Sequence, residues 1–400
     1  MKILYKYFQR FLLICIFAHL HICTSAQDSS HIRISLLTCT PGEELYSTFG
    51  HSALRVTDSN SVTDNVYNYG TFDFGEKDFY LKFIQGRLKY FLSAEPFDDF
   101  QNDYMNDGRG ITEQVLNFSA EEKIKIYRAL LENIKPQNRF YLYDFFMDNC
   151  TTQLRDIIVK NHEPVMVLPA VMPVNYTFRD ALHQYMQGSS MAWSRLGIDI
   201  LLGASGDAVM EPAQQEFLPD NLMHALDSST NTLVVASSKK LFHTEPVKKE
   251  TVFFTPLVLF SCIFLLYVLL SAFKNKTAKN ILQVLDSFLF FIVGVIGIIL
   301  LSVWLITDYP MLKNNYNLLW AWPTHIIYAF LMHRDSKRVR VFSLFLTVFL
   351  ALLLISWAFL AQRMDSALIP IILLMIFRGI AKAFVSRSGR GENSGHSEAS

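Results

Sequence analysis

The chain has 400 residues, no formal net charge, and a composition that is 51% hydrophobic and 14% aromatic. A balanced charge provides no basic field, so nucleic acid is not an expected partner. The hydrophobic excess lies toward the C-terminal end, which predicts an exported soluble domain followed by a membrane domain.

The N-terminus has the pattern of a secretory signal. Basic residues precede a short apolar run over residues 11–20, and Thr24-Ser25-Ala26 offers small residues for cleavage. We therefore predict a signal peptide over residues 1–26. Two alternatives stay open: a lipoprotein signal at Cys23, although Ile22 stands where a small residue is preferred, and an uncleaved anchor.

Residues 27–245 are predicted to form one exported domain that is long enough to bury a core. Alternating apolar residues predict strands, and apolar residues at helical spacing predict helices. The predicted strands are 32–37, 52–56, 65–69 and 111–118, and the predicted helices are 73–86, 97–103, 120–133 and 151–160. Strands interleaved with helices indicate an α+β fold.

Residues 252–385 are predicted to form an all-α membrane domain of about five helices. The apolar runs are 252–273, 284–306, 318–332, 341–361 and 367–385, and the Gly/Ser-rich residues 386–400 are a predicted disordered tail. Lysine and arginine gather in the loops after the first and third runs and in the tail. The positive-inside rule then places these loops in the cytoplasm and the first domain in the periplasm, so the expected location is the inner membrane.

Cys150 is the candidate nucleophile. It lies in the polar stretch Asp148-Asn149-Cys150-Thr151-Thr152, in which Asn149 is a good N-cap. A cysteine in the first turn of a helix has a lowered thiol pKa, and free backbone N–H groups there can hold an oxyanion. The alternative is a small buried cysteine that packs a helix, although such residues usually have apolar neighbours.

His51 is the candidate base, because it follows Phe49-Gly50 and opens a predicted strand. A base of this kind needs an orienting partner, which Asn68 or Tyr69 can supply. Alternation along a strand sends these two side chains to opposite faces, so only one can point at His51. Arg55 shares the face of His51 and could contact an anionic head group or pair with Asp148; a structural ion pair is the alternative.

A disulfide and a zinc site are the chemical alternatives to the Cys–His pair. A disulfide between Cys39 and Cys150 is possible in an oxidising compartment. The sequence lacks the closely spaced ligands that a zinc site requires, so no metal and no cofactor is expected.

The predicted substrate-contacting residues are Arg55, Asn149 and Trp320. Trp320 is included because it lies with several asparagines at the predicted outer surface.

The order of histidine before an Asn-Cys helix resembles the circularly permuted, papain-like enzymes that include lecithin retinol acyltransferase. A closer resemblance is to the bacterial Lnb-type lipoprotein N-acyltransferases. The motifs that carry it are Thr40-Pro41-Gly42, Phe49-Gly50-His51, Asn68-Tyr69-Gly70, Asp148-Asn149-Cys150, Phe217-Leu218-Pro219 and Asn317-Leu318-Leu319-Trp320. One departure is Asp308-Tyr309, where the resemblance predicts a histidine after the aspartate.

The resemblance implies a membrane-bound acyltransferase with Cys150 as nucleophile and His51 as base. It implies a membrane phospholipid or a diacylglyceryl group as acyl donor and the N-terminal amine of a lipoprotein as acceptor. The alternatives are a membrane-anchored cysteine amidase or peptidase that acts on cell-wall peptides, and a non-catalytic scaffold with a disulfide.

Overall fold

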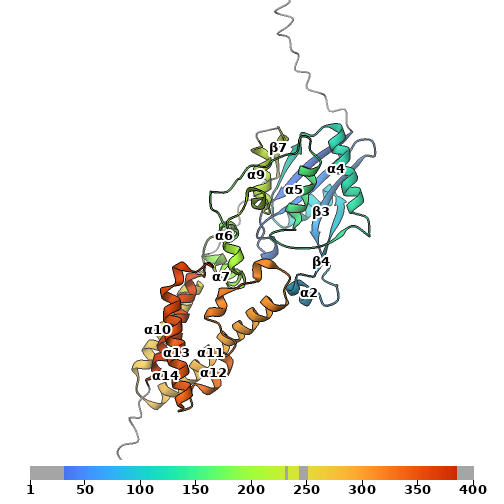
Figure 1. Ribbon diagram of the computed structural model, residues 1–400. Coiled ribbons are helices and arrows are strands. Elements are labelled where there is room, and N and C mark those ends of the chain that lie inside the picture. Colours follow the sequence, from blue (N-terminus) through green and yellow to red (C-terminus); the bar gives the residue numbers. More distant parts are fainter. Residues whose placement is uncertain (1–30, 230–232, 243–250, 385–400) are drawn as a thin grey trace, which may run out of the picture.

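The computed structural model describes residues 31–229, 233–242 and 251–384. A sheet domain comes first along the chain and a bundle of helices follows it, with α6 and α7 between them (Figure 1). The predicted signal peptide and the C-terminal tail lie outside the described residues.

The first domain contains a seven-stranded antiparallel sheet with the strand order β6-β4-β3-β2-β1-β5-β7. The strands are β1 (Ile32–Cys39), β2 (His51–Asp58), β3 (Thr63–Thr71), β4 (Lys89–Pro96), β5 (Ile111–Leu116), β6 (Phe140–Leu142) and β7 (Val235–Phe242). Strands β1, β2 and β3 form the centre, where both faces are buried. The site-bearing strands are therefore held on two sides by neighbours.

Side chains alternate between the two faces of the central strands, so the sheet has a buried core on each face. Leu36, Leu54 and Tyr67 face one side, in the same buried cluster as side chains of α4, α5 and α9. Leu37 and Ala53 face the other side with side chains of α3. The helices of this domain are α2 (Phe79–Gln85), α3 (Phe97–Asn106), α4 (Ala120–Asn133), α5 (Cys150–Lys160), α6 (Phe178–Tyr185), α7 (Ala192–Leu201), α8 (Pro212–Gln215) and α9 (Pro219–Asp227).

The predicted strands at the centre of the sheet and the helices α3, α4 and α5 are confirmed within a few residues. Three strands were not predicted: β4, β6 and β7, of which β6 has only three residues. β4 carries charges and ends in Pro96, and β7 is largely exposed, so neither shows a clear alternation. The predicted helix 73–86 is shorter, because only Phe79–Gln85 is helical.

The helical region contains α10 (Pro256–Ala272), α11 (Lys276–Ile306), α12 (His325–Leu331), α13 (Lys337–Ile355) and α14 (Ile369–Ala383). Three helices of the described chain are long and apolar enough to cross a membrane: Lys276–Ile306, Lys337–Ile355 and Ser366–Ala383. The predicted run 318–332 contains only the seven-residue α12. At 1.5 Å per residue this helix rises about 10 Å, against a hydrocarbon thickness of about 30 Å.

Polar contacts join the two regions. On the side of the first region, Arg179 of α6 is buried and pairs with Asp199 of α7 at 2.6 Å and with Asp207 at 2.9 Å. Arg363, from the loop after α13, reaches Asp180 and Asp207. The sheet domain is therefore fixed to the helical region through α6 and α7 rather than tethered by a free linker.

Candidate active site

Cys150 is the first residue of α5, and the helix start is built around Asn149. The Asn149 side chain accepts hydrogen bonds from the backbone N–H groups of Thr151 and Thr152, and the Thr152 hydroxyl accepts one from the Asn149 N–H. This reciprocal capping fixes the first turn of the helix. The predicted N-cap is confirmed, and the thiol lies at the positive end of the helix dipole.

His51 is the first residue of β2, which lies in the middle of the sheet. The prediction that His51 opens a strand is confirmed, and that strand is a central one. Gly50 precedes it with φ +79°, and a Cβ on Gly50 would lie 2.7 Å from the Cys39 carbonyl oxygen. The tight turn before His51 thus requires glycine.

Alternation along β3 separates Asn68 from Tyr69. His51 Nε2 lies 3.2 Å from Asn68 Oδ1. The Tyr69 hydroxyl is on the other face of the sheet, where it accepts a hydrogen bond of 2.7 Å from Asn133 in α4. Of the two predicted partners, the structure brings only Asn68 to His51.

Glu95 completes this arrangement and was not predicted. Asn68 Nδ2 donates to Glu95 Oε1 over 2.7 Å. Because a carboxylate only accepts hydrogen bonds, this contact fixes the orientation of the amide and leaves Oδ1 facing His51. His51 Nε2 must then carry the proton, so Nδ1 is the nitrogen available to the thiol. Glu95 was missed because its strand, β4, was missed.

The thiol and the imidazole shift each other's protonation. Burial raises the pKa of Cys150, but the charge and hydrogen bond of His51, the Ser52 backbone N–H and the Thr151 hydroxyl outweigh it and bring the pKa to about 7. Burial lowers the pKa of His51, and the neighbouring Cys150 and Asn68 more than reverse this, so the net pKa is raised. The geometry therefore favours a thiolate beside an imidazolium.

Cys39, Cys150 and Cys262 are all free cysteines, so the alternative of a Cys39–Cys150 disulfide is wrong for this structure. Cys39 is fully buried, and burial raises its pKa to about 12, despite a hydrogen bond with Tyr104. Cys39 stays a neutral thiol, whereas Cys150 is partly exposed and has a lowered pKa. Within residues 31–229, 233–242 and 251–384, no three His, Cys, Asp or Glu side chains gather as metal ligands.

Two of the three predicted substrate contacts, Arg55 and Asn149, lie in the sheet domain, and the structure corrects both. Arg55 does not reach Asp148; it pairs with Asp64 at 2.6 Å and with Glu113 at 3.3 Å, so the structural ion pair is the correct alternative. Asn149 is 3% exposed, and its amide also donates to two backbone carbonyl oxygens. All its hydrogen-bonding groups are used inside the protein, which leaves none for a substrate.

Trp320 is likewise not at an outer surface. It is 1% exposed, and its indole N–H donates to Asn317 Oδ1 over 2.9 Å. Asn317 Nδ2 in turn donates to the backbone oxygens of Asp199 and Ile200 in α7. Trp320 therefore stabilises the junction between the two regions.

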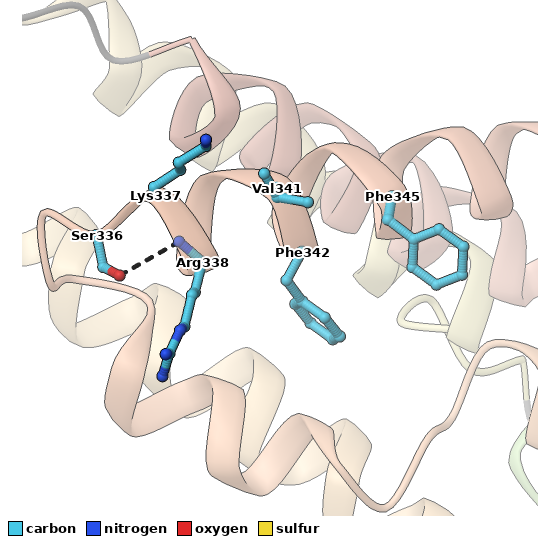
Figure 2. Close-up of a pocket in the computed structure, with 6 residues that line it drawn as sticks. All are labelled: Ser336, Lys337, Arg338, Val341, Phe342 and Phe345. Carbon is cyan, nitrogen blue, oxygen red and sulfur yellow. Dashed lines mark hydrogen bonds between the residues drawn. The ribbon is translucent and has the colours of Figure 1, made fainter.

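A separate surface cavity of about 670 Å³ lies at the start of α13 (Figure 2). It is lined by Ser336, Lys337, Arg338, Val341, Phe342 and Phe345. None of the predicted site residues lines it.

Two family domains match the chain. The Lnb N-terminal periplasmic domain matches residues 20–183, and the Lnb transmembrane domain matches residues 248–388. The chain belongs to the Lnb family. Membership indicates a membrane-associated enzyme of lipoprotein processing with a periplasmic domain. No curated protein and no solved structure is detectably similar to this Lnb chain.

Both candidate reactive residues, His51 and Cys150, fall inside the Lnb periplasmic match, as does the unpredicted Glu95. The predicted resemblance is thus confirmed at the level of the two domains. The sheet is antiparallel with helices on both faces, which agrees with the predicted α+β class.

Proposed function

We propose that this Lnb protein is a lipoprotein N-acyltransferase that uses Cys150 and His51. The observation that carries the proposal is the chain of contacts from Glu95 through Asn68 and His51 to a thiol with a pKa of about 7. Such a thiol is about half ionised at pH 7, and its neighbouring imidazolium can protonate a leaving group. We also propose that the periplasmic domain is related to the circularly permuted, papain-like enzymes.

In the first half-reaction, the Cys150 thiolate attacks an ester carbonyl of a glycerophospholipid or a lipoprotein diacylglyceryl group. A C–S bond forms, the ester C–O bond breaks, and His51 gives its proton to the departing alkoxide. The Asn149 side chain already occupies the Thr151 and Thr152 N–H groups, so the Cys150 N–H would be the donor of the first turn that holds the developing oxyanion, beside the Ser52 N–H that contacts the thiol. The product is an acyl thioester on Cys150 and a lyso-lipid alcohol.

In the second half-reaction, the α-amine of a lipoprotein's N-terminal cysteine attacks the thioester. An amide C–N bond forms, the C–S bond breaks, and His51 takes the proton released by the amine. Cys150 returns as the thiolate beside the imidazolium. An amine outcompetes water here only if the site excludes bulk solvent, which suits a domain held against a membrane.

For the membrane region we propose five membrane-embedded segments, an inner-membrane location and a cytoplasmic tail. The pattern of basic loops supports this orientation. The short helices α10 and α12 would be two of these five segments. Helix α12 would span only part of the membrane and packs against α11. This arrangement keeps both lipid substrates within reach of the periplasmic domain.

The test is mass spectrometry of the full-length protein after incubation with phospholipid vesicles. Wild-type protein should gain one acyl mass on the peptide that contains Cys150, and the Cys150→Ala variant should gain none. Cys262→Ala, which removes an exposed thiol in α10, is the matched control and should retain the adduct. Normal lipoprotein N-acylation by Cys150→Ala would rule the mechanism out, and release of a cell-wall peptide would favour the amidase.

A further inference from the structure

The segment 72–85 contains a dense group of exposed apolar side chains. No side chain of α2 is buried. The exposed large side chains are Phe74 (71%), Tyr80 (76%), Leu81 (52%), Phe83 (46%) and Ile84 (43%). Exposed apolar surface of this density on one short segment marks an interaction site.

This segment is fixed to the outer end of α11. The Asp308 N–H donates to the Gln85 carbonyl oxygen over 2.8 Å, and Arg87 pairs with the Asp308 side chain at 2.7 Å. Gly86, with φ +72°, packs against the Tyr309 ring. Figure 1 shows α2 at the end of the sheet domain that faces the helical region.

The position of α11 in the membrane determines how far α2 lies from the hydrocarbon layer. Asp308 follows two residues after Ile306, where α11 ends, and Leu305 and Ile306 are exposed apolar side chains. Since residues 284–306 rise about 35 Å at 1.5 Å per residue, Ile306 lies near the outer limit of the hydrocarbon layer. A segment bonded to Asp308 lies at the membrane surface, and its apolar side chains continue the lipid-facing surface of α11.

A row of aromatic rings leads from α2 to the thiol. Phe79 lies 5.9 Å from Phe72, Phe72 lies 5.3 Å from Tyr90, and Tyr90 stacks on Tyr143 at 4.2 Å between ring centroids. The row passes close to the thiol at Phe72, because a Cβ on Gly70, two residues before Phe72, would lie 3.5 Å from the Cβ of Cys150. The row is a continuous line of packed aromatic side chains between α2 and the strand end near Cys150.

We propose that segment 72–85 is a lipid-entry surface: it inserts into the outer leaflet of the membrane and guides a phospholipid acyl chain along the aromatic row to Cys150. The partner is the phospholipid bilayer, and the role in delivery rests on the proposed acyltransferase function. Of the charged side chains in the segment, Lys82 pairs with Glu76 at 2.7 Å, and the exposed Asp73, Lys77 and Asp78 precede the apolar helix α2.

The first test is photo-crosslinking of the full-length protein in phosphatidylglycerol nanodiscs, with p-benzoylphenylalanine at position 80. The matched control carries the same residue at position 62, because Val62 is 89% exposed and lies in the turn at the other end of β2. Position 80 should yield a phospholipid adduct and position 62 none. Absence of a lipid adduct at position 80, or capture of protein alone, would overturn the proposal.

The second test measures delivery. Tyr80→Asp/Leu81→Asp should lower acyl loading of Cys150 at least tenfold, whereas Val62→Asp should leave it unchanged. Alkylation of Cys150 by iodoacetamide should stay within twofold of wild type in both variants. Unchanged acyl loading in the double variant would refute the delivery role. If Cys150→Ala still acylates lipoproteins, the proposed function is wrong. The crosslink at position 80 remains an independent test of whether segment 72–85 contacts lipid.

Discussion

His51 is held by Asn68 at one ring nitrogen, so the other nitrogen serves the thiol. The pKa of Cys150 is about 7 because His51 offsets the cost of burying a thiolate. At this residue scale the site depends on few contacts, and each can be removed separately. The pKa shifts lead to one prediction, and the hydrogen bond between Asn68 and Glu95 leads to another.

His51→Ala should raise the pKa of Cys150 above its ordinary value, because burial remains while the opposing charge is lost. In wild type the thiolate is lost as the pH falls through about 7. In the variant it is lost at a higher pH, so alkylation by iodoacetamide at pH 7 should fall about tenfold or more, since one pKa unit is a factor of ten. A pH profile of alkylation measures this, and an unshifted midpoint would contradict the pairing.

Glu95→Gln should weaken catalysis although Glu95 touches no reacting atom. Glutamine can donate to Asn68 Oδ1, which lets the amide rotate and present its NH₂ group to His51. Acyl loading should fall about tenfold, and Asn68→Ala should cost about a hundredfold, within the range for a positioned base. Glu121→Gln, on a side chain that is 79% exposed, is the control. A pH profile separates a positioning effect from misfolding.

At the scale of elements, the site forms where β2 begins, β3 ends and α5 begins. The turn before β2 is the most constrained of these. Gly50→Ala would force a Cβ to 2.7 Å from the Cys39 carbonyl oxygen, whereas Gly108→Ala, at a similar φ of +65°, meets nothing within 4 Å. Both variants bear the strain of positive φ, about 1–2 kcal/mol, and only Gly50→Ala adds a backbone collision.

We therefore expect Gly50→Ala to displace His51 and to lower acyl loading at least about tenfold, a loss of positioning. Gly108→Ala should lower thermal stability only slightly and keep its activity. Thermal unfolding and acyl loading of both variants make the comparison. Equal losses of activity in the two would show that the turn does not position His51.

The sequence pattern predicted the central elements because they alternate cleanly or keep helical spacing. It also narrowed the partner of His51 to Asn68 or Tyr69, but the choice needed the register of β3 against β2. Glu95 could not be found, because β4 pairs with β3 across an intervening segment and has a weak pattern. Trp320 was misplaced because a buried indole and one at a membrane interface look alike in a sequence.

At the scale of the whole molecule, the orientation of the sheet domain depends on buried charges at α6 and α7. Arg179→Ala would leave Asp199 and Asp207 as buried carboxylates that lack their buried cation. The free energy of unfolding should fall by about 3–5 kcal/mol, as expected when a buried pair is broken. Arg363→Ala removes a side chain that is 51% exposed and should cost about 1 kcal/mol or less.

Thermal unfolding of the full-length protein in detergent measures both variants. A second measurement is the yield of the lipid crosslink at position 80. This yield should fall in Arg179→Ala, because the sheet domain is then less firmly fixed to the helical region. Equal melting temperatures for the two arginine variants would show that the buried cluster does not secure the junction.

The last strand of the sheet, β7, has a further consequence. It lies at the sheet edge, and its side chains Ser237, Ser238, Lys239 and Lys240 are exposed. A membrane confines neighbouring copies of a protein to two dimensions, which raises the frequency of encounters between their sheets. Two adjacent lysines repel the same strand of another copy, so this edge resists strand-by-strand aggregation in a crowded bilayer.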